Sequence, residues 1–465
     1  MKTAATTIIN EQEISDILQK YSRPSHEEVR DVLAKAAEMK GLNLQEVAVL
    51  TGISDPIQLH ELFETANHIK DTIYGKRLVL FAPLYISNLC ANECTYCAFR
   101  AKNKAIVRRS LSQNEIEHET ELLIKQGHKR VLLVAGESYP KQGFQYVLDA
   151  VQSVYRARYS DAEIRRVNVN VAPLSADEFK LLKAEKIGTY QLFQETYHHQ
   201  TYKNVHLGGK KRDYDWRISA LHRAMEAGID DVGIGVLFGL FDYRFELLAM
   251  MQHIAELERV FGVGPHTISV PRMEPATGSD VASHPPFPVS DLEFRKIVAI
   301  LRLAVPYTGI IMSTRETAKM RSETFALGVS QISAGSRTNP GGYEEGVDDD
   351  VSGQFCLGDH RPLDEVIRDV AQMGYVPSFC TGCYRLGRTG QDFMDLAKPG
   401  AIKAHCGPNA LSSFMEYLNN YASPETYQTG IQLIEKTIAG MEGLPADRAR
   451  KLVNRVKKGQ KDVFC

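Results

Sequence analysis

Three cysteines within eight residues constrain this chain more than any other feature. They are Cys90, Cys94 and Cys97, spaced Cx3Cx2C, and they follow the apolar run 78–86. Three thiolates on one short loop can hold three corners of a four-iron cluster and leave the fourth iron open. An iron with an open position is a binding site, whereas clusters that only carry electrons usually have four protein ligands. The loop therefore predicts an iron–sulfur site that binds a ligand.

Two other readings of these cysteines fit less well. A structural zinc site usually has four ligands in two close pairs, and no second pair lies nearby in the sequence. A disulfide framework is typical of small secreted chains, and this chain has 465 residues. The aromatic residue Tyr96 precedes the last cysteine, so the loop resembles the signature of the radical S-adenosylmethionine (SAM) superfamily. The resemblance implies that the open iron chelates the amino and carboxylate groups of SAM. Reduction then yields a 5′-deoxyadenosyl radical.

Charge, hydropathy and cysteine usage indicate where the protein works and which partners to expect. The formal net charge is -2, which gives no reason to expect a nucleic-acid or membrane partner. The chain starts without the apolar core of a secretory signal, and no apolar run is long enough to span a bilayer. Six of the 8 cysteines fall into two spaced triads, a usage that indicates metal ligation in a reducing compartment. We therefore expect a cytoplasmic, oxygen-sensitive protein.

Apolar runs alternate with amphipathic helical patterns from residue 77 to residue 338. The strand candidates are 77–87, 130–137, 166–174, 189–198, 231–240, 267–276, 307–316 and 327–338. Helical patterns lie between them, for example at 114–127, 176–186, 215–228 and 245–261. This alternation predicts an α/β fold, a (β/α)8 TIM barrel of the radical SAM type, with active residues at the carboxyl ends of the strands. A doubly wound sheet is the competing fold, but no Gly-x-Gly-x-x-Gly follows the first strand.

The segments on either side of the barrel suggest two appended parts. Residues 1–70 are charged and helical in pattern, and we predict an N-terminal helical extension there. The barrel is assigned to 71–375, and its acidic run 348–350 is interpreted as a solvated loop. Residues 376–465 are predicted to form a C-terminal, mostly α iron–sulfur domain, with helices near 408–420, 424–441 and 445–458.

Residues at the predicted strand ends could hold SAM. The candidates are Tyr96, Gly136, Glu137, Asn170, Glu195 and Gly235. The superfamily often has Gly-Gly-Glu after the second strand to grip the SAM amino group, and here its first glycine is Ala135. A carboxylate at Glu195 can accept both ribose hydroxyls. Other roles stay open, because strand glycines often only relieve crowding and Glu195 could form a salt bridge.

A second cysteine triad lies beyond the barrel. Cys380 and Cys383 form a CxxC motif, and Cys406 follows after 22 residues. A CxxC alone fits zinc, redox dithiols and clusters alike, but this triad again offers three thiolates. We interpret it as a second iron–sulfur site, with a zinc site completed by His405 or Cys465 as the alternative. The nearby cations that could offset cluster charge are Arg385, Arg388 and Lys398.

The combination of both triads resembles the HydG family, the tyrosine lyases of [FeFe]-hydrogenase maturation. The strand ends MSTRE at 312–316 and SAGSRT at 333–338 are shared with this group. The related ThiH family of the thiamine pathway resembles the barrel but lacks the second triad. The resemblance implies an auxiliary cluster at the second triad, [4Fe-4S] or [5Fe-5S], with a fifth iron bridged by free L-cysteine. It also implies that His266, just before the sixth strand, holds that iron.

The resemblance implies a lyase that cleaves the Cα–Cβ bond of L-tyrosine to p-cresol and dehydroglycine. Dehydroglycine would give carbon monoxide and cyanide, which leave on an iron–cysteine unit for the hydrogenase H-cluster. The implied partners are a reductant and, transiently, HydE and HydF. A cation must hold the substrate carboxylate, and Arg315 is the first candidate, with Arg321, Ser333 and Ser336 beside it. Open alternatives are a ThiH-like lyase (2-iminoacetate synthase), a radical SAM enzyme for another amino acid, and a non-enzymatic iron–sulfur carrier.

Overall fold

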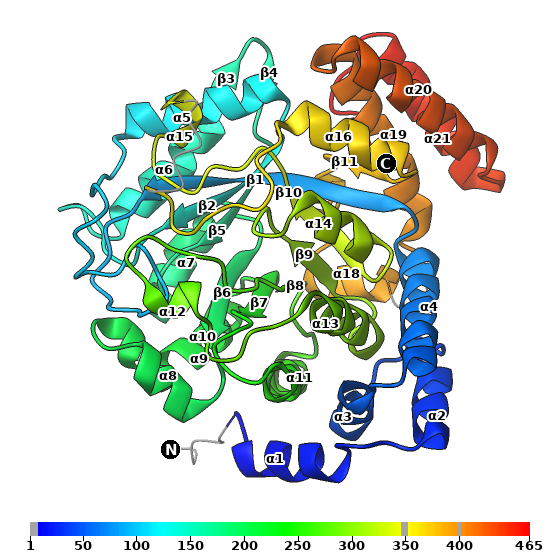
Figure 1. Ribbon diagram of the computed structural model, residues 1–465. Coiled ribbons are helices and arrows are strands. Elements are labelled where there is room, and N and C mark those ends of the chain that lie inside the picture. The colour runs from blue at the N-terminus through cyan, green and yellow to red at the C-terminus, as the bar shows by residue number, and fades with distance from the viewer. Residues whose placement is uncertain (1–7, 346–351, 398–400) are drawn as a thin grey trace.

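The computed structural model describes residues 8–345, 352–397 and 401–465. Its centre is a closed barrel of eight parallel strands, and β10 pairs with β1 to close it (Figure 1). The barrel strands are β1 (Arg77–Ser87), β2 (Arg130–Ala135), β5 (Arg166–Asn170), β6 (Tyr190–Glu195), β7 (Val232–Val236), β8 (Thr267–Ser269), β9 (Gly309–Met312) and β10 (Val329–Ser333). Every one of them falls within a predicted strand, so the predicted (β/α)8 barrel is confirmed and an open doubly wound sheet is excluded.

Most strands end earlier than the sequence pattern indicates. The clearest case is β8, which stops at Ser269 although the apolar pattern continues to residue 276. Pro271 and Pro275 lie in that continuation, and proline has no N–H to donate to a neighbouring strand. The residues beyond each strand therefore form loops at the carboxyl mouth of the barrel, where they are free to line a site.

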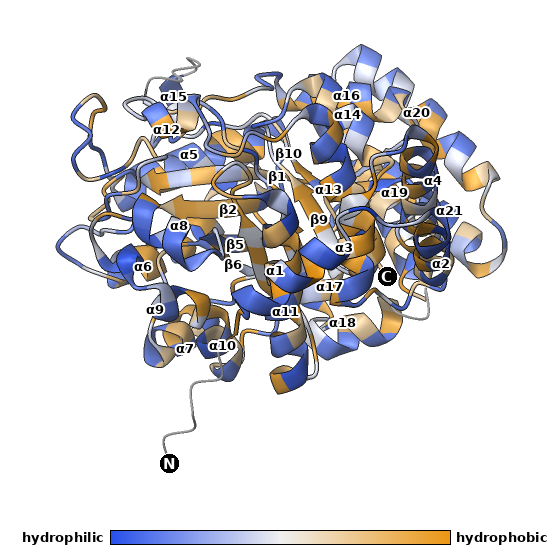
Figure 2. Ribbon diagram, turned by 60° about the horizontal axis from the view of Figure 1, so that its bottom comes forward, coloured by the Kyte–Doolittle hydropathy of each residue, from blue (hydrophilic) through white to orange (hydrophobic). Residues whose placement is uncertain are grey.

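Helices surround the barrel and bury their apolar faces against it, so the hydrophobic residues lie inside (Figure 2). After β1 and β2 come α5 (Gln113–Gln126) and α6 (Gln145–Arg156), the latter followed by the small hairpin β3 (Arg158–Tyr159) and β4 (Ala162–Glu163). The others along the barrel are α7 (Ala176–Ala184), α8 (His199–Val205), η1 (Lys210–Arg212), α9 (Tyr214–Ile218), α10 (Ala220–Glu226), α11 (Tyr243–Phe261), α12 (Asp280–Ser283), α13 (Asp291–Ala304), α14 (Ala318–Phe325), α15 (Gly342–Glu345) and α16 (Leu363–Gln372).

The N-terminal helices cover one side of the barrel (Figure 1). They are α1 (Glu11–Lys20), α2 (His26–Ala36), α3 (Leu44–Gly52) and α4 (Pro56–Ile73). Helices α1, α3 and α4 pack on α11 and α13, and α2 packs on α3 and α4. The buried Lys296 of α13 donates to the carbonyl oxygens of Thr51 and Ile53 at 2.6 and 2.5 Å. This lysine satisfies the carbonyls at the end of α3, which fixes the extension against the barrel.

The C-terminal part is attached to the barrel by one short strand. β11 (Val376–Ser378) pairs with the first residues of β1, Arg77–Val79, whereas β2 pairs with its later residues. The helices that follow are α17 (Gly382–Arg385), α18 (Gly390–Ala397), α19 (Lys403–Asn420), α20 (Pro424–Ala439) and α21 (Gly443–Lys457). The division at 70 and 375 stays a prediction, because one continuous hydrophobic core joins all three parts.

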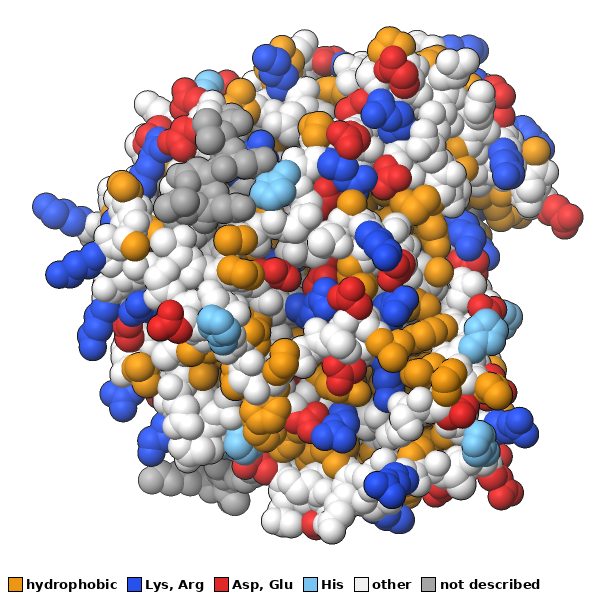
Figure 3. Space-filling view, in the orientation of Figure 1, with side chains coloured by type: hydrophobic (Ala, Val, Ile, Leu, Met, Phe, Trp, Pro, Cys, Tyr) orange, Lys and Arg blue, Asp and Glu red, His pale blue; other side chains and the backbone are white. Residues whose placement is uncertain are grey.

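Positive and negative side chains are interspersed over the face seen in Figure 3, in keeping with the small net charge. The acidic run 348–350 and Lys398 lie outside the described residues. Within the described ranges, none of the helices has the length and apolarity needed to cross a membrane.

Two cysteine sites at opposite ends of the barrel

The first cysteine loop follows β1 and is fixed against the segment after α8. The loop residue Glu93 accepts a backbone hydrogen bond from Leu207 at 2.8 Å, and the Thr95 N–H donates to the Val205 carbonyl at 2.9 Å. The Glu93 carboxylate also pairs with Arg100 at 2.7 Å. Cys94 is only 5% exposed, so these contacts hold the three thiols inside the carboxyl mouth of the barrel.

The three thiols open into one cavity, the SAM-side cavity, with most of the predicted SAM residues. Its lining includes Cys90, Cys94, Cys97, Tyr96, Gly136, Glu137, Asn170, Glu195, Lys211, Arg217, Glu274, Arg315 and Gln354. Burial raises the pKa of the Cys97 thiol to about 11 and raises that of Cys94 further. The thiols are therefore protonated at neutral pH, and a bound metal must displace those protons.

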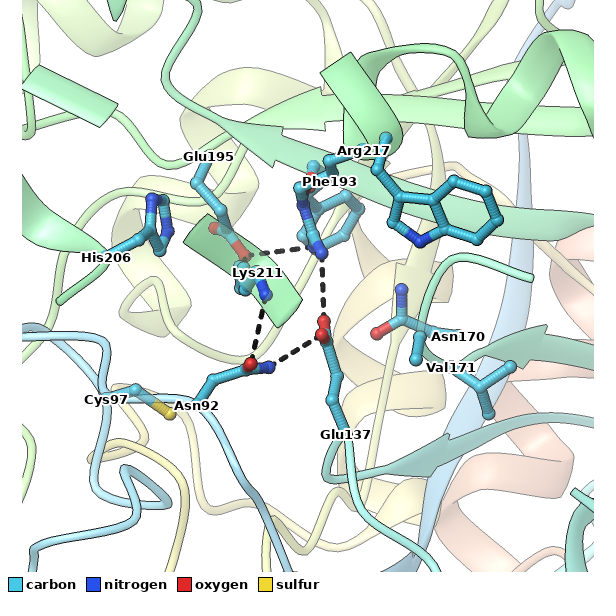
Figure 4. Close-up of polar contacts among 12 residues, drawn as sticks. Asn92, Cys97, Glu137, Asn170, Val171, Phe193, Glu195, His206, Lys211 and Arg217 are labelled. Atoms are coloured by element: carbon cyan, nitrogen blue, oxygen red, sulfur yellow. Dashed lines mark hydrogen bonds and ion pairs between the residues drawn. The ribbon is translucent and has the colours of Figure 1, made fainter. Parts of the chain in front are cut away.

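A network of opposite charges forms one wall of the SAM-side cavity (Figure 4). Arg217 contacts both carboxylates, Glu137 at 2.9 Å and Glu195 at 3.7 Å, and Lys211 pairs with Glu195 at 2.6 Å. Asn92 links the network to the cysteine loop, because its amide donates to Glu137 at 2.7 Å. Burial alone would raise the pKa of Glu137, but the charges of Arg217 and Lys211 lower it overall, so the carboxylate stays ionised.

Two backbone features explain why these residues stand at the strand ends. Glu195 is one of the few non-glycine residues with a positive φ, at 73°, a conformation that costs of order 1–3 kcal/mol. Its two cationic partners hold it there. A Cβ on Gly136 would lie 2.2 Å from the Leu89 carbonyl oxygen, so only glycine lets the cysteine loop pass beside β2.

A second cavity, the inner cavity, continues from the first into the barrel. The two share Asn170, Phe193, Arg315 and Gln354, and the inner one also contains Ser333 and Tyr85. The Arg315 guanidinium lies on the Phe355 ring, 3.2 Å from its centre, and has no ion-pair partner among the described residues. Burial lowers the pKa of Arg315 because nothing fully compensates its charge. A half-buried arginine without an ion-pair partner among the described residues is suited to bind a carboxylate from a ligand.

Three of the predicted site residues do not line these cavities. Arg321 is 1% exposed, pairs with Asp359 and donates to the Ser333 carbonyl at 2.6 Å. Ser336 is buried, and its hydroxyl has no hydrogen-bond partner within the described part of the chain. Gly235 makes room for the neighbouring strand and for Phe193, because a Cβ there would lie 2.8 Å from the Ser269 carbonyl oxygen and 3.0 Å from the Phe193 ring. Their predicted roles in binding therefore gain no support from the structure.

The second triad lies at the amino end of the barrel. Cys380, Cys383 and Cys406 share a cavity, the auxiliary cavity, with His266 from the loop before β8. The other lining residues come mainly from the starts of strands and from α17 to α19, including Arg77, Val79, Arg130, Gly309, Gln331, Tyr384, Arg388, Phe393 and Asn409. The structure thus brings together the four residues that were predicted to hold the auxiliary cluster and its fifth iron.

His266 is held in place by contacts on both sides. Its Nδ1 atom lies 3.6 Å from the Asp231 carboxylate, and its ring packs edge-on against Phe393 with centroids 4.7 Å apart. Burial lowers the pKa of His266, while Asp231 raises it less, so the imidazole is neutral. A neutral imidazole whose Nδ1–H faces a carboxylate is the usual form of a metal-ligating histidine.

Arginines provide the positive charge around the second triad. Arg77 and Arg130 begin β1 and β2, and Arg388 approaches from the C-terminal part. Burial would lower the pKa of Arg77, but the thiolates of the triad raise it overall. Arg385, in contrast, turns away to pair with Asp462. Neither of the residues proposed to complete a zinc site, His405 and Cys465, lines the auxiliary cavity.

Each triad offers three thiols around a cavity, which is the kind of ligand set that an iron–sulfur cluster uses. Within the described ranges, no three His, Cys, Asp or Glu side chains converge on one point as ligands to one metal ion. The three thiols of each triad instead surround a cavity, and a four-iron cluster needs ligands at separate corners. The residues present therefore fit an iron–sulfur cluster at each mouth of the barrel.

Comparison with known proteins agrees with this geometry. The Radical SAM superfamily model matches residues 84–254, and the Biotin and Thiamin Synthesis associated domain matches residues 269–376. A crystal structure of HydG, a maturase of the [FeFe]-hydrogenase, is 43% identical and covers 98% of this chain and 100% of that chain, with a TM-score of 0.95. The chain belongs to the HydG family of radical SAM enzymes.

Other relatives show where the HydG family differs from its neighbours. HydG from Carboxydothermus hydrogenoformans is 42% identical and covers 96% of this chain and 97% of its own, with a TM-score of 0.83. The 2-iminoacetate synthase of Escherichia coli is 32% identical over 72% of this chain and 85% of its own. The HydG structures thus match almost the whole chain, and the synthase leaves more than a quarter unmatched. Membership of the superfamily implies SAM and a [4Fe-4S] cluster.

Sequence reasoning missed several residues of both sites. Lys211 and Arg217 follow β6 in a stretch without a recognisable motif, and only the fold brings them to the glutamates. Glu274 lies beyond the end of β8, and burial raises its pKa to about 7. Arg77 and Arg130 could have been found from the sequence, because each is a charged residue at the start of an apolar strand.

Proposed function

We propose that this chain is a radical SAM lyase that cleaves the Cα–Cβ bond of L-tyrosine to p-cresol and dehydroglycine. Dehydroglycine is then converted to carbon monoxide and cyanide, which leave on an iron–cysteine unit for the [FeFe]-hydrogenase H-cluster. The observation that carries the proposal is the pair of cysteine cavities at the two mouths of one closed barrel. HydE and HydF are the proposed transient partners.

In this proposal the SAM-side cavity holds a [4Fe-4S] cluster and SAM. The cluster and SAM, when bound and reduced, supply a 5′-deoxyadenosyl radical that takes a hydrogen atom from the substrate. Cys90, Cys94 and Cys97 ligate the cluster. Glu137 and Glu195 are fixed by Arg217 and Lys211, so they accept hydrogen bonds from SAM without reorganising.

The inner cavity is the proposed substrate site. Arg315 binds the tyrosine carboxylate, since its guanidinium is half-buried and has no ion-pair partner among the described residues. Ser333, whose hydroxyl already accepts from the Thr314 N–H at 3.1 Å, adds a polar contact at the end of β10. The half-buried Glu274 lines the adjoining SAM-side cavity together with Arg315, and from there it offers a carboxylate to the substrate ammonium group.

The auxiliary cavity is the proposed site of the second cluster, [4Fe-4S] or [5Fe-5S]. Cys380, Cys383 and Cys406 ligate it, and His266 with a free L-cysteine holds the additional iron. Arg77, Arg130 and Arg388 offset the negative charge of the thiolates. The strands β1, β2, β9 and β10 line both the inner and the auxiliary cavities, so the small fragment can stay within the barrel, away from bulk water.

The test is a product assay on the protein reconstituted with iron and sulfide without oxygen, then given SAM, dithionite and L-tyrosine. We expect p-cresol and carbon monoxide together. p-Cresol without carbon monoxide would favour the second candidate, a ThiH-like 2-iminoacetate synthase, which the 32% identity to that enzyme supports. SAM cleavage without either product would refute tyrosine as the substrate.

A further inference from the structure

Gln354 lies where several loops meet at the carboxyl mouth of the barrel. Its N–H donates to the Thr338 carbonyl at 3.1 Å, and its carbonyl accepts from the Ala98 N–H at 3.4 Å. Ala98 directly follows the third cysteine of the first triad. Gln354 lines both the SAM-side cavity and the inner cavity. Its backbone is therefore tied to the cysteine loop on one side and to the loop after β10 on the other.

The side chain of Gln354 connects a cavity residue to a cysteine sulfur. Its Oε1 atom accepts a hydrogen bond from the Tyr85 hydroxyl at 2.8 Å, and its Nε2 atom lies 3.8 Å from the Cys97 sulfur. A thiolate can only accept hydrogen bonds, and the large sulfur atom allows this longer distance. Since Tyr85 donates to the amide oxygen, the amide N–H groups are left to face the sulfur.

We propose that Gln354 is a positioning residue that sets the reduction potential of the cluster at Cys97 and couples it to the occupancy of the inner cavity. Hydrogen bonds to cluster sulfurs are among the features that set iron–sulfur potentials. The reduced cluster carries one more negative charge, so a donor at the thiolate stabilises it and raises the potential. The family assignment supplies the cluster, and the coupling to tyrosine rests on the proposed function.

Two contacts provide the link to the inner cavity. The Tyr85 hydroxyl holds the amide in orientation, and Tyr85 itself lines that cavity. Phe355, the next residue in the chain, stacks on the Arg315 guanidinium at 3.2 Å. Binding of a ligand carboxylate to Arg315 therefore changes the packing of Phe355, which is next to Gln354 in the chain. A shift of Phe355 changes the distance between the Gln354 amide nitrogen and the Cys97 sulfur.

The first test is an EPR-monitored redox titration of the full chain with both clusters reconstituted and SAM present. The signal that changes on addition of SAM identifies the cluster at the first triad. Gln354→Met fills a similar volume without an N–H donor, and we expect a more negative potential for that signal alone. Gln145→Met, at an exposed glutamine on α6, is the matched control and should not shift it. An unchanged potential in a fully loaded Gln354→Met protein would overturn the proposal.

The second test repeats the titration with L-tyrosine added. We expect tyrosine to move the potential of the unmodified protein and to have much less effect in Gln354→Met and Tyr85→Phe. Tyr85→Phe leaves the cysteine loop and Gln354 in place, so it remains informative if Gln354→Met fails to load iron. An equal tyrosine effect in Tyr85→Phe would refute the coupling. If tyrosine neither binds nor gives p-cresol, the proposed function fails, whereas the titration with SAM alone still decides whether Gln354 tunes the cluster.

Discussion

Each mouth of the barrel has three cysteines, but the charged side chains around them differ between the two mouths. The SAM-side wall interlocks two glutamates with a lysine and an arginine. The auxiliary cavity is lined by three arginines and, among the described residues, by no carboxylate. A wall with both signs of charge suits a zwitterionic ligand that must be held in one orientation, whereas a cationic wall suits an anionic cluster. The charges around the thiolates, more than the thiolates themselves, distinguish the two sites.

The largest expected difference comes from removing one thiolate at each mouth. Cys406→Ser should keep p-cresol formation within about threefold and abolish carbon monoxide, because the two reactions occur in separate cavities. Cys94→Ser should abolish SAM cleavage and both products. The measurement is a parallel assay of p-cresol, carbon monoxide and 5′-deoxyadenosine, with iron content as a check on loading. Loss of both products in Cys406→Ser would mean that the second triad serves the fold instead.

Arg315→Gln should separate substrate binding from SAM binding. The variant removes the cation proposed to hold the tyrosine carboxylate, and loss of such a hydrogen-bonded charge contact in a cavity costs about 2 kcal/mol, a factor of about thirty in KM. SAM affinity should change little, because the guanidinium packs on Phe355 and, among the described residues, forms no ion pair with Glu137 or Glu195. Steady-state p-cresol kinetics and SAM binding by equilibrium dialysis give the two values. Unchanged p-cresol kinetics would remove Arg315 from the substrate site.

Asp231→Asn should weaken only the auxiliary site. The carboxylate faces Nδ1 of His266 at 3.6 Å, and replacing such a partner typically costs 10–100-fold, here about tenfold or more, in metal affinity. Iron retention against a chelator, read by the spectrum of the second cluster, measures the effect. Asp230→Asn, at the exposed neighbouring residue, is the control. Equal iron retention in both variants would show that Asp231 does not orient the histidine.

The smallest expected effect concerns Glu274 and pH. Burial raises the pKa of Glu274 to about 7, with Glu316 adding to the shift, so the carboxylate is neutralised as the pH falls below that value. The affinity for tyrosine should then fall a few-fold as the pH is lowered from about 8 to about 6. The Glu274→Gln variant should bind tyrosine weakly, with an affinity that does not depend on pH across this range. Because the folded-state pKa is above its ordinary value, ionisation destabilises the fold as the pH rises, and Glu274→Gln should be the more stable protein at pH 8. A pH profile identical to that of the unmodified protein would exclude Glu274.

Features with a local pattern were predictable from the sequence. The spacing of Cys90, Cys94 and Cys97 predicts a cluster loop, and the alternation of apolar runs with helical patterns predicts the barrel. Each of these patterns involves residues that are close together along the chain. The structure also places His266 in one cavity with Cys380. That placement follows from the barrel topology, because residues that precede strands meet at the amino mouth. Whether this histidine binds iron stays a prediction.

Pairing between distant loops was not predictable. Arg217 meets Glu137 across 80 positions, and Gln354 meets Cys97 across 257, and neither residue has a sequence pattern that marks its partner. Arg321 shows the converse case, since this arginine on the helix after β9 is predicted as a second carboxylate ligand but already pairs with Asp359. Position at a strand end selects the mouth of the barrel, but the side chains packed around a residue decide whether it is available to a ligand.

The pairing of the first residues of β1 with β11 has a consequence for the solubility of truncated forms. The first residues of β1, Arg77–Val79, bond to β11, and its later residues bond to β2. A chain that ends before residue 376 would leave that stretch of backbone as an unpaired edge, which is a template for aggregation. During synthesis the same edge stays open until nearly the whole chain has emerged, since its partner follows the last barrel strand. β11 thus covers the edge of β1, which is the first strand to be synthesised. A version of this protein that lacks β11 should require a chaperone, or an added charge on β1, to stay soluble.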